Sequence, residues 1–161
     1  MASIFKLTLR YPFEAILLLI LFVVFRVMPV DVASSIGGFI GRSLGPLLPT
    51  TRRAKRNLEL VYPEKSERER TGIMGDMWDN LGRTVAEFPH LGRLSRSEGS
   101  NVELVGAEQI LEMAANRTPA ILVGAHMANW ELMSVYLSRA GLDLTSVARV
   151  MNNKLSQVVI E

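Results

Sequence analysis

Apolar residues are spread unevenly along the chain, and the longest uncharged run lies close to its start. Ala15 to Phe25 is a run of eleven residues without a charge. As a helix it would be only about 16 Å long, whereas the hydrocarbon core of a bilayer is roughly 30 Å thick. The wider segment from Tyr11 to Val30 has twenty residues, with Glu14 near one end and Arg26 near the other. Since an arginine held mid-membrane costs about 2.5–3.5 kcal/mol, Arg26 would reach towards the headgroups, and we interpret this segment as a retained membrane anchor.

A cleaved signal peptide is an alternative for the same segment. Lys6 and Arg10 would form its basic start, and the apolar run would form its core. Arg26 and Asp31, however, stand where small neutral residues should prepare cleavage. A buried helix of a soluble core fits less well, because the run offers no polar face.

Three glycines follow at a regular spacing. Gly37, Gly41 and Gly45 recur every four residues, so a helix here would carry one smooth glycine face. Such a face lets two helix backbones approach closely, as membrane helices often do. We expect a second membrane-embedded or interfacial helix, with a flexible glycine-rich loop as the alternative. Residues 1–50 are therefore predicted to be membrane anchor and interfacial helices.

A basic cluster comes directly after this part. The stretch "TRRAKRNLELVYPEK" holds Arg52, Arg53, Lys55 and Arg56 before its first acidic residue. Each such charge gains about 1 kcal/mol near an anionic leaflet, and the cluster biases this side of an anchor to the cytoplasm. The alternative is a solvated helix face.

A long helix is predicted next. Ser66 and Glu69 have the spacing of a capping box, and Pro89 marks the end of the pattern. Between them apolar residues recur at helical spacing: Ile73, Met77, Trp78, Leu81, Val85 and Phe88. These residues are expected to pack in the core or to face substrate. The loop at 92–100 is a plausible boundary.

From Asn101 the pattern of apolar and polar residues changes to short segments that alternate in type. We expect strands at 101–105, 118–125 and 142–150, with helices at 106–117 and 129–141 between them. Strands alternating with helices of this length indicate a parallel sheet covered by helices. The predicted fold is therefore α/β: N-terminal membrane-anchoring helices followed by an incomplete parallel sheet with flanking helices, the latter within residues 51–161.

The last residues, 152–161, read as the start of another helix. Val158, Val159 and Ile160 are apolar and nothing caps the helix, and the sheet would have an exposed edge. We therefore expect the front part of a longer protein or a truncated gene product.

Charge divides the chain in the same way as hydropathy. Residues 1–56 hold eight Lys and Arg against Glu14 and Asp31, whereas the remainder holds ten against fourteen Asp and Glu. The start is basic and apolar, and the rest is mildly acidic. The chain has no cysteine, which excludes disulfides, thiolate zinc sites and a cysteine nucleophile.

The most polar joint between two apolar segments is "GAHMANWE", residues 124–131. His126 and Glu131 are five apart, so a continuous helix would turn them about 140° away from each other. A bend between a strand end and a helix start would bring them together, at the place where open α/β sheets bind ligands. A histidine held by a carboxylate can act as a general base on a hydroxyl group.

Two neighbours complete this candidate site. Backbone N–H groups near Asn129 would stabilise a developing oxyanion, and Trp130 would pack as a wall or support. The alternative is that His126 has only a structural role and that Glu131 only stabilises the start of the helix. The chain has two histidines and His90 lies in a distant loop, so we expect neither a metal site nor a cofactor. With no Gly-x-Ser-x-Gly elbow and no phosphate loop, direct attack by a substrate hydroxyl is the simplest chemistry.

These residues resemble a known family. "GAHMANWE" looks like the His-x4-Glu motif of the bacterial lipid A biosynthesis acyltransferases, the late lauroyl/myristoyl transferases. The resemblance extends in order through "RNLELVYPEKS", "DNLGRTVAEF", "VELVGAEQI" and "ARVMNN", and covers about the first half of such a protein. Ala128 departs from the family, which usually has glycine there, and a further functional arginine is expected just beyond Glu161.

The resemblance implies a function and its partners. His126 would be the general base and Glu131 its partner, while Arg149 and Asn153 would contact substrate. An acyl carrier protein thioester would be the donor and a hydroxyl of a lipid A precursor the acceptor, at the bacterial inner membrane with the catalytic domain on its cytoplasmic face. No nucleic acid partner is expected. Because such carrier proteins are acidic, the basic cluster would help to dock one.

Two other functions stay open at this point. The chain could be a catalytically inactive, truncated membrane protein, or an acyltransferase that acts on a lysophospholipid or another glycolipid. The residues do not separate these acceptors.

Overall fold

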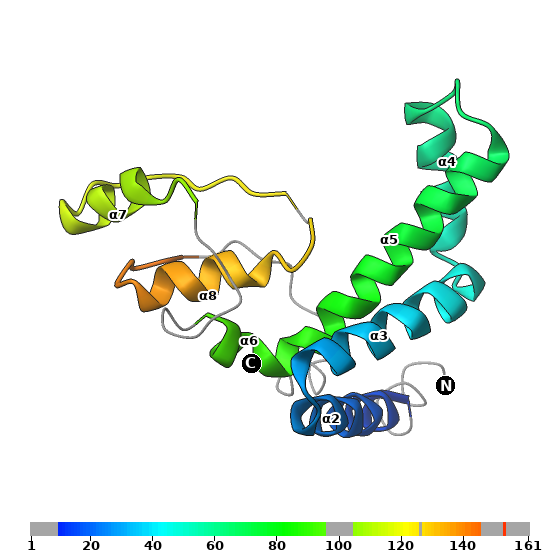
Figure 1. Cartoon of the computed structure of the whole chain (residues 1–161), viewed down its shortest axis with the longest axis horizontal. Coiled ribbons are helices and arrows are strands. Elements are labelled where there is room, and N and C mark those ends of the chain that lie inside the picture. Colours follow the sequence, from blue (N-terminus) through cyan, green and yellow to red (C-terminus); the bar gives the residue numbers. More distant parts are fainter. Residues whose placement is uncertain (1–9, 96–104, 126, 146–152, 154–161) are drawn as a thin grey trace. The chain divides into compact units, whose positions relative to one another are not determined.

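The protein is described by a computed structural model that covers residues 10–95, 105–125, 127–145 and 153. Its elements are helices: α2 (Tyr11–Val27), α3 (Val30–Leu44), the 3₁₀ turn η2 (Gly45–Leu47), α4 (Thr51–Val61), α5 (Glu67–Glu87), the 3₁₀ turn η3 (Phe88–His90), α6 (Leu91–Leu94), α7 (Glu108–Ala115) and α8 (Glu131–Arg139) (Figure 1). The chain forms two compact units, one comprising residues 25–88 and the other comprising residues 1–24 with 89–161.

The unit of residues 25–88 is organised by the packing of α3 against α5. The two helices run antiparallel, with Gly37 facing Ala86 and Gly41 facing Trp78. A Cβ atom added at Gly37 would lie 2.5 Å from the Cβ of Ala86, closer than real Cβ atoms come. The predicted glycine face is therefore confirmed: it lets two backbones touch, and its partner is α5.

The opposite side of this contact is also made of small residues. Gly82 lies against Gly37 and Gly41, and the indole ring of Trp78 covers Gly45. Trp78 and Ala86 are buried, so the stripe of α5 that packs is Trp78, Gly82 and Ala86, each four residues after the last. Of the apolar residues expected to pack, Met77, Leu81 and Val85 remain 39%, 37% and 41% exposed beside this stripe.

Polar side chains flank the glycine contact. Arg42 binds Asp76 at 2.8 Å, and Ser34 donates its hydroxyl to Glu87 at 2.7 Å, so each joins α3 to α5. An ion pair as exposed as that of Arg42 and Asp76 contributes little stability, about 0–1 kcal/mol. These bonds join the two helices beside the seam, whereas the close backbone contact at the glycines sets their register.

Helix α5 begins at the predicted capping box. The Glu69 backbone N–H donates to Ser66 Oγ at 3.3 Å, and the Ser66 N–H donates to Glu69 Oε2 at 2.8 Å. The Ser66 hydroxyl also donates to Glu69 Oε2 at 2.7 Å, and this bond, followed by that from the Ser66 N–H, lowers the pKa of the Glu69 carboxyl group. The helix then continues for 21 residues to Glu87, two residues before Pro89. The predicted start and end of this helix are both confirmed.

The second unit holds most of α2 together with α6, α7 and α8. Leu137 of α8 is 1% exposed and is the buried residue of that helix. Arg139, at the end of α8, donates from Nη1 to the Gly92 carbonyl oxygen of α6 at 2.6 Å. Helix α8 is thus held to α6, and its start carries the residues of the candidate site.

The predicted α/β fold is wrong for the described residues, which contain no strand. Residues 118–125 follow α7 without regular structure, and the side chains of Ile121 and Val123 are each 91% exposed. Residues 142–145 are likewise irregular, while 101–104, 146–150 and 154–161 lie outside the described residues. A parallel strand takes its hydrogen bonds from neighbouring strands, and a run of β-branched residues does not by itself provide a neighbour.

The predicted membrane-spanning anchor is also corrected. Within the described residues, no helix is both long and apolar enough to cross a bilayer. The apolar pattern continues to Val30, but α2 ends at Val27 and Pro29 precedes the next helix, so α2 has 17 residues. At 1.5 Å per residue it is about 26 Å long. The transmembrane helix and the inner-membrane localisation that was inferred with it are not supported.

The glycine contact predicts opposite effects for the same substitution at two positions of α5. A Cβ at Gly82 would meet backbone atoms of Gly37, so Gly82→Ala should lower the free energy of unfolding by about 2 kcal/mol. Gly72 has nothing within 4 Å, and Gly72→Ala should raise it by about 1 kcal/mol, because alanine favours a helix. Denaturant unfolding followed by circular dichroism measures both. Equal stability of the two variants would contradict the contact.

Candidate active site

The segment that leads into α8 reverses the direction of the chain. A Cβ added at Gly124 would lie 3.2 Å from Cε of Met133, although these residues are nine apart. On a continuous helix they would be separated by about 13 Å along the axis. Gly124 and the first turn of α8 therefore pack against each other, and the motif of residues 124–131 spans the reversal.

Ala128 has the backbone conformation that produces part of this reversal. Its φ angle is +48°, in the left-handed region that L-residues with a side chain rarely adopt. Such a conformation costs an alanine roughly 1–2 kcal/mol, whereas glycine adopts it freely. The position is also the one at which the sequence departs from the glycine usual in the family it resembles.

Glu131 occupies the first turn of α8, and its carboxylate is held by its neighbour. The indole N–H of Trp130 donates to Glu131 Oε1 at 3.0 Å, and both residues are half-buried. A hydrogen bond to an ionised carboxylate is about twice as strong as one between neutral groups. Trp130 therefore orients the carboxylate, a more specific contribution than the wall or support expected of it.

Asn129 precedes this pair and is half-buried. Its backbone carbonyl accepts the N–H of Leu132 at 3.2 Å, which closes the first turn of α8. Glu131 at this position also interacts favourably with the positive end of the helix dipole. The Glu131 carboxylate is thus held at the bend by its hydrogen bond from Trp130 and by its favourable interaction with the start of α8.

Two of the predicted site residues, His126 and Arg149, lie outside the described residues. The other histidine, His90, is 1% exposed and closes η3, so it is buried in a helical turn and does not lie in an open loop. In the described stretches, no three His, Cys, Asp or Glu residues are grouped as metal ligands would be.

Asn153 is bonded to the start of α2. It is 5% exposed, and its side-chain amide donates to the Tyr11 carbonyl oxygen at 3.1 Å and to Glu14 Oε2 at 3.0 Å. Glu14 also accepts a hydrogen bond from Arg10 at 2.6 Å. The bond from Arg10, then that from Asn153, lowers the pKa of the Glu14 carboxyl group. Asn153 is thereby joined to the start of α2.

Sequence reasoning missed the role of Glu14. In the sequence, Glu14 is an acidic residue at the edge of an apolar run, which indicates only a boundary of that run. Its partner is 139 residues away, so local spacing could not have identified the contact.

The left-handed residue gives a stability prediction at the site. Ala128→Gly should raise the free energy of unfolding by about 0.5–1 kcal/mol, because relief of backbone strain exceeds the added entropy of the unfolded glycine. Ala140 has a φ of −72°, so Ala140→Gly adds the same entropy without relieving strain and should destabilise. Thermal unfolding of both variants measures the difference, and a destabilising Ala128→Gly would argue against the left-handed turn.

Comparison with known proteins identifies the family. No solved structure matches the chain significantly. A lipid A biosynthesis lauroyltransferase of Escherichia coli (strain K12) is 35% identical over 89 residues, which cover 50% of this chain. The matched part of the chain spans 28% of that relative. The family model for bacterial lipid A biosynthesis acyltransferases matches residues 2–161, and the chain therefore belongs to this family.

Proposed function

We propose that the protein is an acyltransferase of lipid A biosynthesis that moves a fatty acyl chain from an acyl carrier protein thioester to a hydroxyl group of a lipid A precursor. Membership of the family supports the reaction class. The observation that carries the assignment of the site is the reversal between Gly124 and Met133, with the Glu131 carboxylate held at its end by Trp130. This arrangement suits a pair of catalytic residues that a continuous helix would separate.

In the proposed reaction, His126 removes the proton of the acceptor hydroxyl as its oxygen attacks the thioester carbonyl carbon. A tetrahedral intermediate forms, its C–S bond breaks, and the imidazolium returns the proton to the carrier's thiolate. Glu131 accepts a hydrogen bond from the other ring nitrogen and so selects the reactive tautomer of His126. Neither a cofactor nor a metal ion is required for these proton transfers.

The remaining site residues have supporting roles in this proposal. The backbone near Asn129 would stabilise the oxyanion of the tetrahedral intermediate. Arg149 would contact substrate. Asn153 would have a positioning role, which its bonds to Tyr11 and Glu14 of α2 support.

The proposed substrates determine the partners. The donor is delivered by an acidic carrier protein. The acceptor carries several acyl chains, so the protein would meet it at a lipid surface. The family name indicates the lipid A pathway.

Substitution of the two catalytic residues tests the proposal. His126→Ala and Glu131→Gln should each lower the rate of acyl transfer by about 10²-fold or more, the usual contribution of a general base. Glu108 begins α7 as Glu131 begins α8, which makes Glu108→Gln a matched control that should retain full activity. Transfer of a labelled acyl chain from carrier protein to the precursor measures the rate. Turnover near the wild-type value in His126→Ala would end the assignment.

The hydrogen bond of Trp130 makes a separate prediction. Trp130→Phe keeps an aromatic ring but removes the N–H donor, so kcat should fall about tenfold with little change in KM. Trp78→Phe is the control, because the buried indole N–H of Trp78 has no hydrogen-bond partner among the described residues. Equal effects of the two substitutions would show that Trp130 contributes by packing alone.

A further inference from the structure

Met133 contributes its thioether to the reversal at the candidate active site. Its Cε lies 3.2 Å from the position that a Cβ at Gly124 would occupy, so this end of the side chain is packed against Gly124. Met133 belongs to the first turn of α8 and is nonetheless 41% exposed, so small solutes reach the residue. It therefore combines access from solvent with a contact on which the turn depends.

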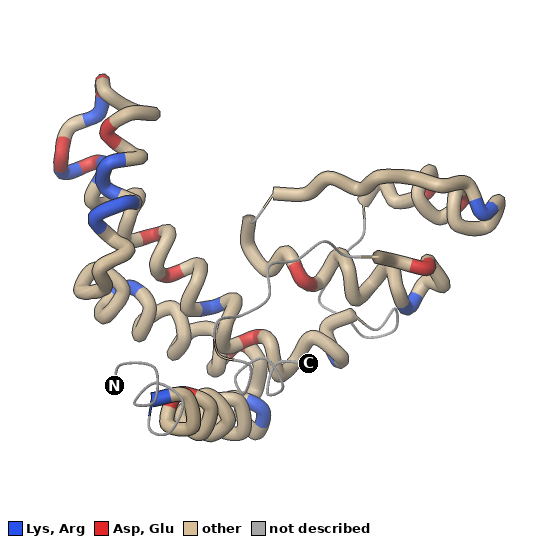
Figure 2. The backbone as a smooth tube through the Cα atoms, turned by 180° about the vertical axis from the view of Figure 1, so that it is seen from behind, with Lys and Arg blue, Asp and Glu red and all other residues tan. Residues whose placement is uncertain are grey.

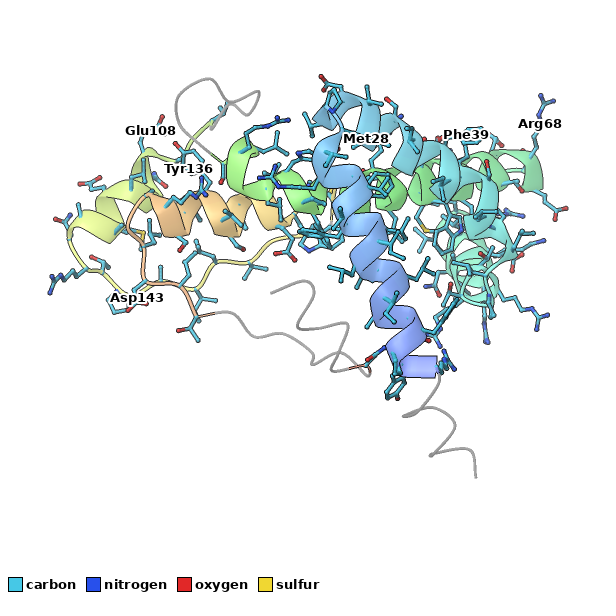
Figure 3. All side chains as sticks on the ribbon, turned by 90° about the horizontal axis from the view of Figure 1, so that it is seen from below. Met28, Phe39, Arg68, Glu108, Tyr136 and Asp143 are labelled. Carbon is cyan, nitrogen blue, oxygen red and sulfur yellow. The ribbon has the colours of Figure 1, made fainter. Side chains whose placement is uncertain are left out.

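The other methionines that the structure describes do not share this combination. Met28 packs against a buried cluster at the junction of α2 and α3 (Figure 3). Met77 of α5 is 39% exposed, nearly as much as Met133, but it lies in the unit of residues 25–88. Met127 is 75% exposed, so most of its side chain is in solvent. Exposure governs how fast a methionine is oxidised, whereas packing governs whether its oxidation changes the structure.

Hydrogen peroxide converts a methionine thioether to a sulfoxide without any other reactant. The sulfur attacks one peroxide oxygen, an S–O bond forms, and the O–O bond breaks. The proton on the transferred oxygen moves to the departing oxygen, which leaves as water. Sulfur loses two electrons and the peroxide gains them. The product is polar and chiral where the thioether was apolar, and it is larger by one oxygen atom.

A sulfoxide at Met133 is incompatible with the contact to Gly124. The added oxygen is bonded to the sulfur, next to the Cε that already packs there, and overpacking forces the neighbouring groups apart. Residues 118–130 include no Lys, Arg, Asp or Glu, and the described part of this segment is tan in Figure 2. The segment therefore offers the sulfoxide oxygen no cation, and hydration of that oxygen draws the side chain away from Gly124.

We propose that Met133 is an oxidation site at which hydrogen peroxide reversibly inactivates the candidate active site. Loss of the contact with Gly124 opens the reversal and displaces Glu131, two residues before Met133 in the same helical turn. Methionine sulfoxide is reduced by methionine sulfoxide reductases, which makes the change reversible. The loss of turnover rests on the proposed function, whereas the oxidation of Met133 and the opening of the turn do not.

Peroxide treatment of the full chain tests the oxidation and the opening of the turn. Peptide mass spectrometry should show that Met127 and Met133 each gain one oxygen, Met127 faster because it is more exposed. The chain has two tryptophans, so in Trp78→Phe the emission of Trp130 alone reports on the site. Treatment should shift this emission in Trp78→Phe and in Trp78→Phe/Met127→Leu, but not in Trp78→Phe/Met133→Leu.

The rate of acyl transfer measures the consequence. Treated wild type should be slower by about tenfold or more, because a displacement of catalytic groups by about 1 Å can cost about 10²-fold. Leucine is close to methionine in volume and has no sulfur, so treated Met133→Leu should stay within about twofold of its own untreated rate. Met77→Leu, the control of similar exposure, should be inactivated like the wild type. Methionine sulfoxide reductases with dithiothreitol should restore the rate of the wild type.

The opposite results would overturn the inference. They are a Met133 that stays unoxidised while Met127 is oxidised, an emission shift that persists with Met133→Leu, and protection of the rate by Met77→Leu. A loss of rate that the reductases do not reverse has the same meaning. If the untreated protein transfers no acyl chain, the proposed function fails, but the mass and emission measurements still decide whether Met133 is the oxidation site that opens the turn.

Discussion

The contact between α3 and α5 is the constraint on which the helical unit of residues 25–88 depends. At Gly37 and Gly82 the two backbones lie so close that neither position has room for a side chain. A contact of this kind tolerates almost no sliding, because a shift of one residue along either helix would place a side chain in the seam. The capping box at Ser66 then determines where α5 starts, and the ion pair between Lys55 and Glu67 joins α4 to that start.

Features that depend on neighbouring residues were predictable from the sequence. Glycines four residues apart define a face as soon as the segment is helical, and a capping box is a contact between residues three apart. The partner of the glycine face could have been found in the same way, because Trp78, Gly82 and Ala86 form a second stripe with the same spacing. Glycine faces are also common between membrane helices, so the spacing alone does not identify α5 as the partner.

The presence or absence of a sheet could not be predicted from neighbouring residues. A strand acquires its hydrogen bonds from residues distant in sequence, so residues 118–125 can have the composition of a strand without forming one. The contact between Asn153 and Glu14 has the same character: both residues were noticed, but nothing local to either indicates the other. Contacts between residues distant in the sequence cannot be predicted from local spacing, either in the fold or in the candidate site.

The bend at the candidate site was predicted from the chemistry of its residues. In the structure the bend depends on the backbone conformation. Sequence reasoning required a break between residues 126 and 131, because a continuous helix would separate the two side chains. The left-handed φ of Ala128 and the packing of Gly124 on Met133 supply such a break. The same φ explains why glycine suits this position and why alanine here stores strain. Ala128 thus holds a left-handed backbone conformation within the turn that the proposed proton transfer needs.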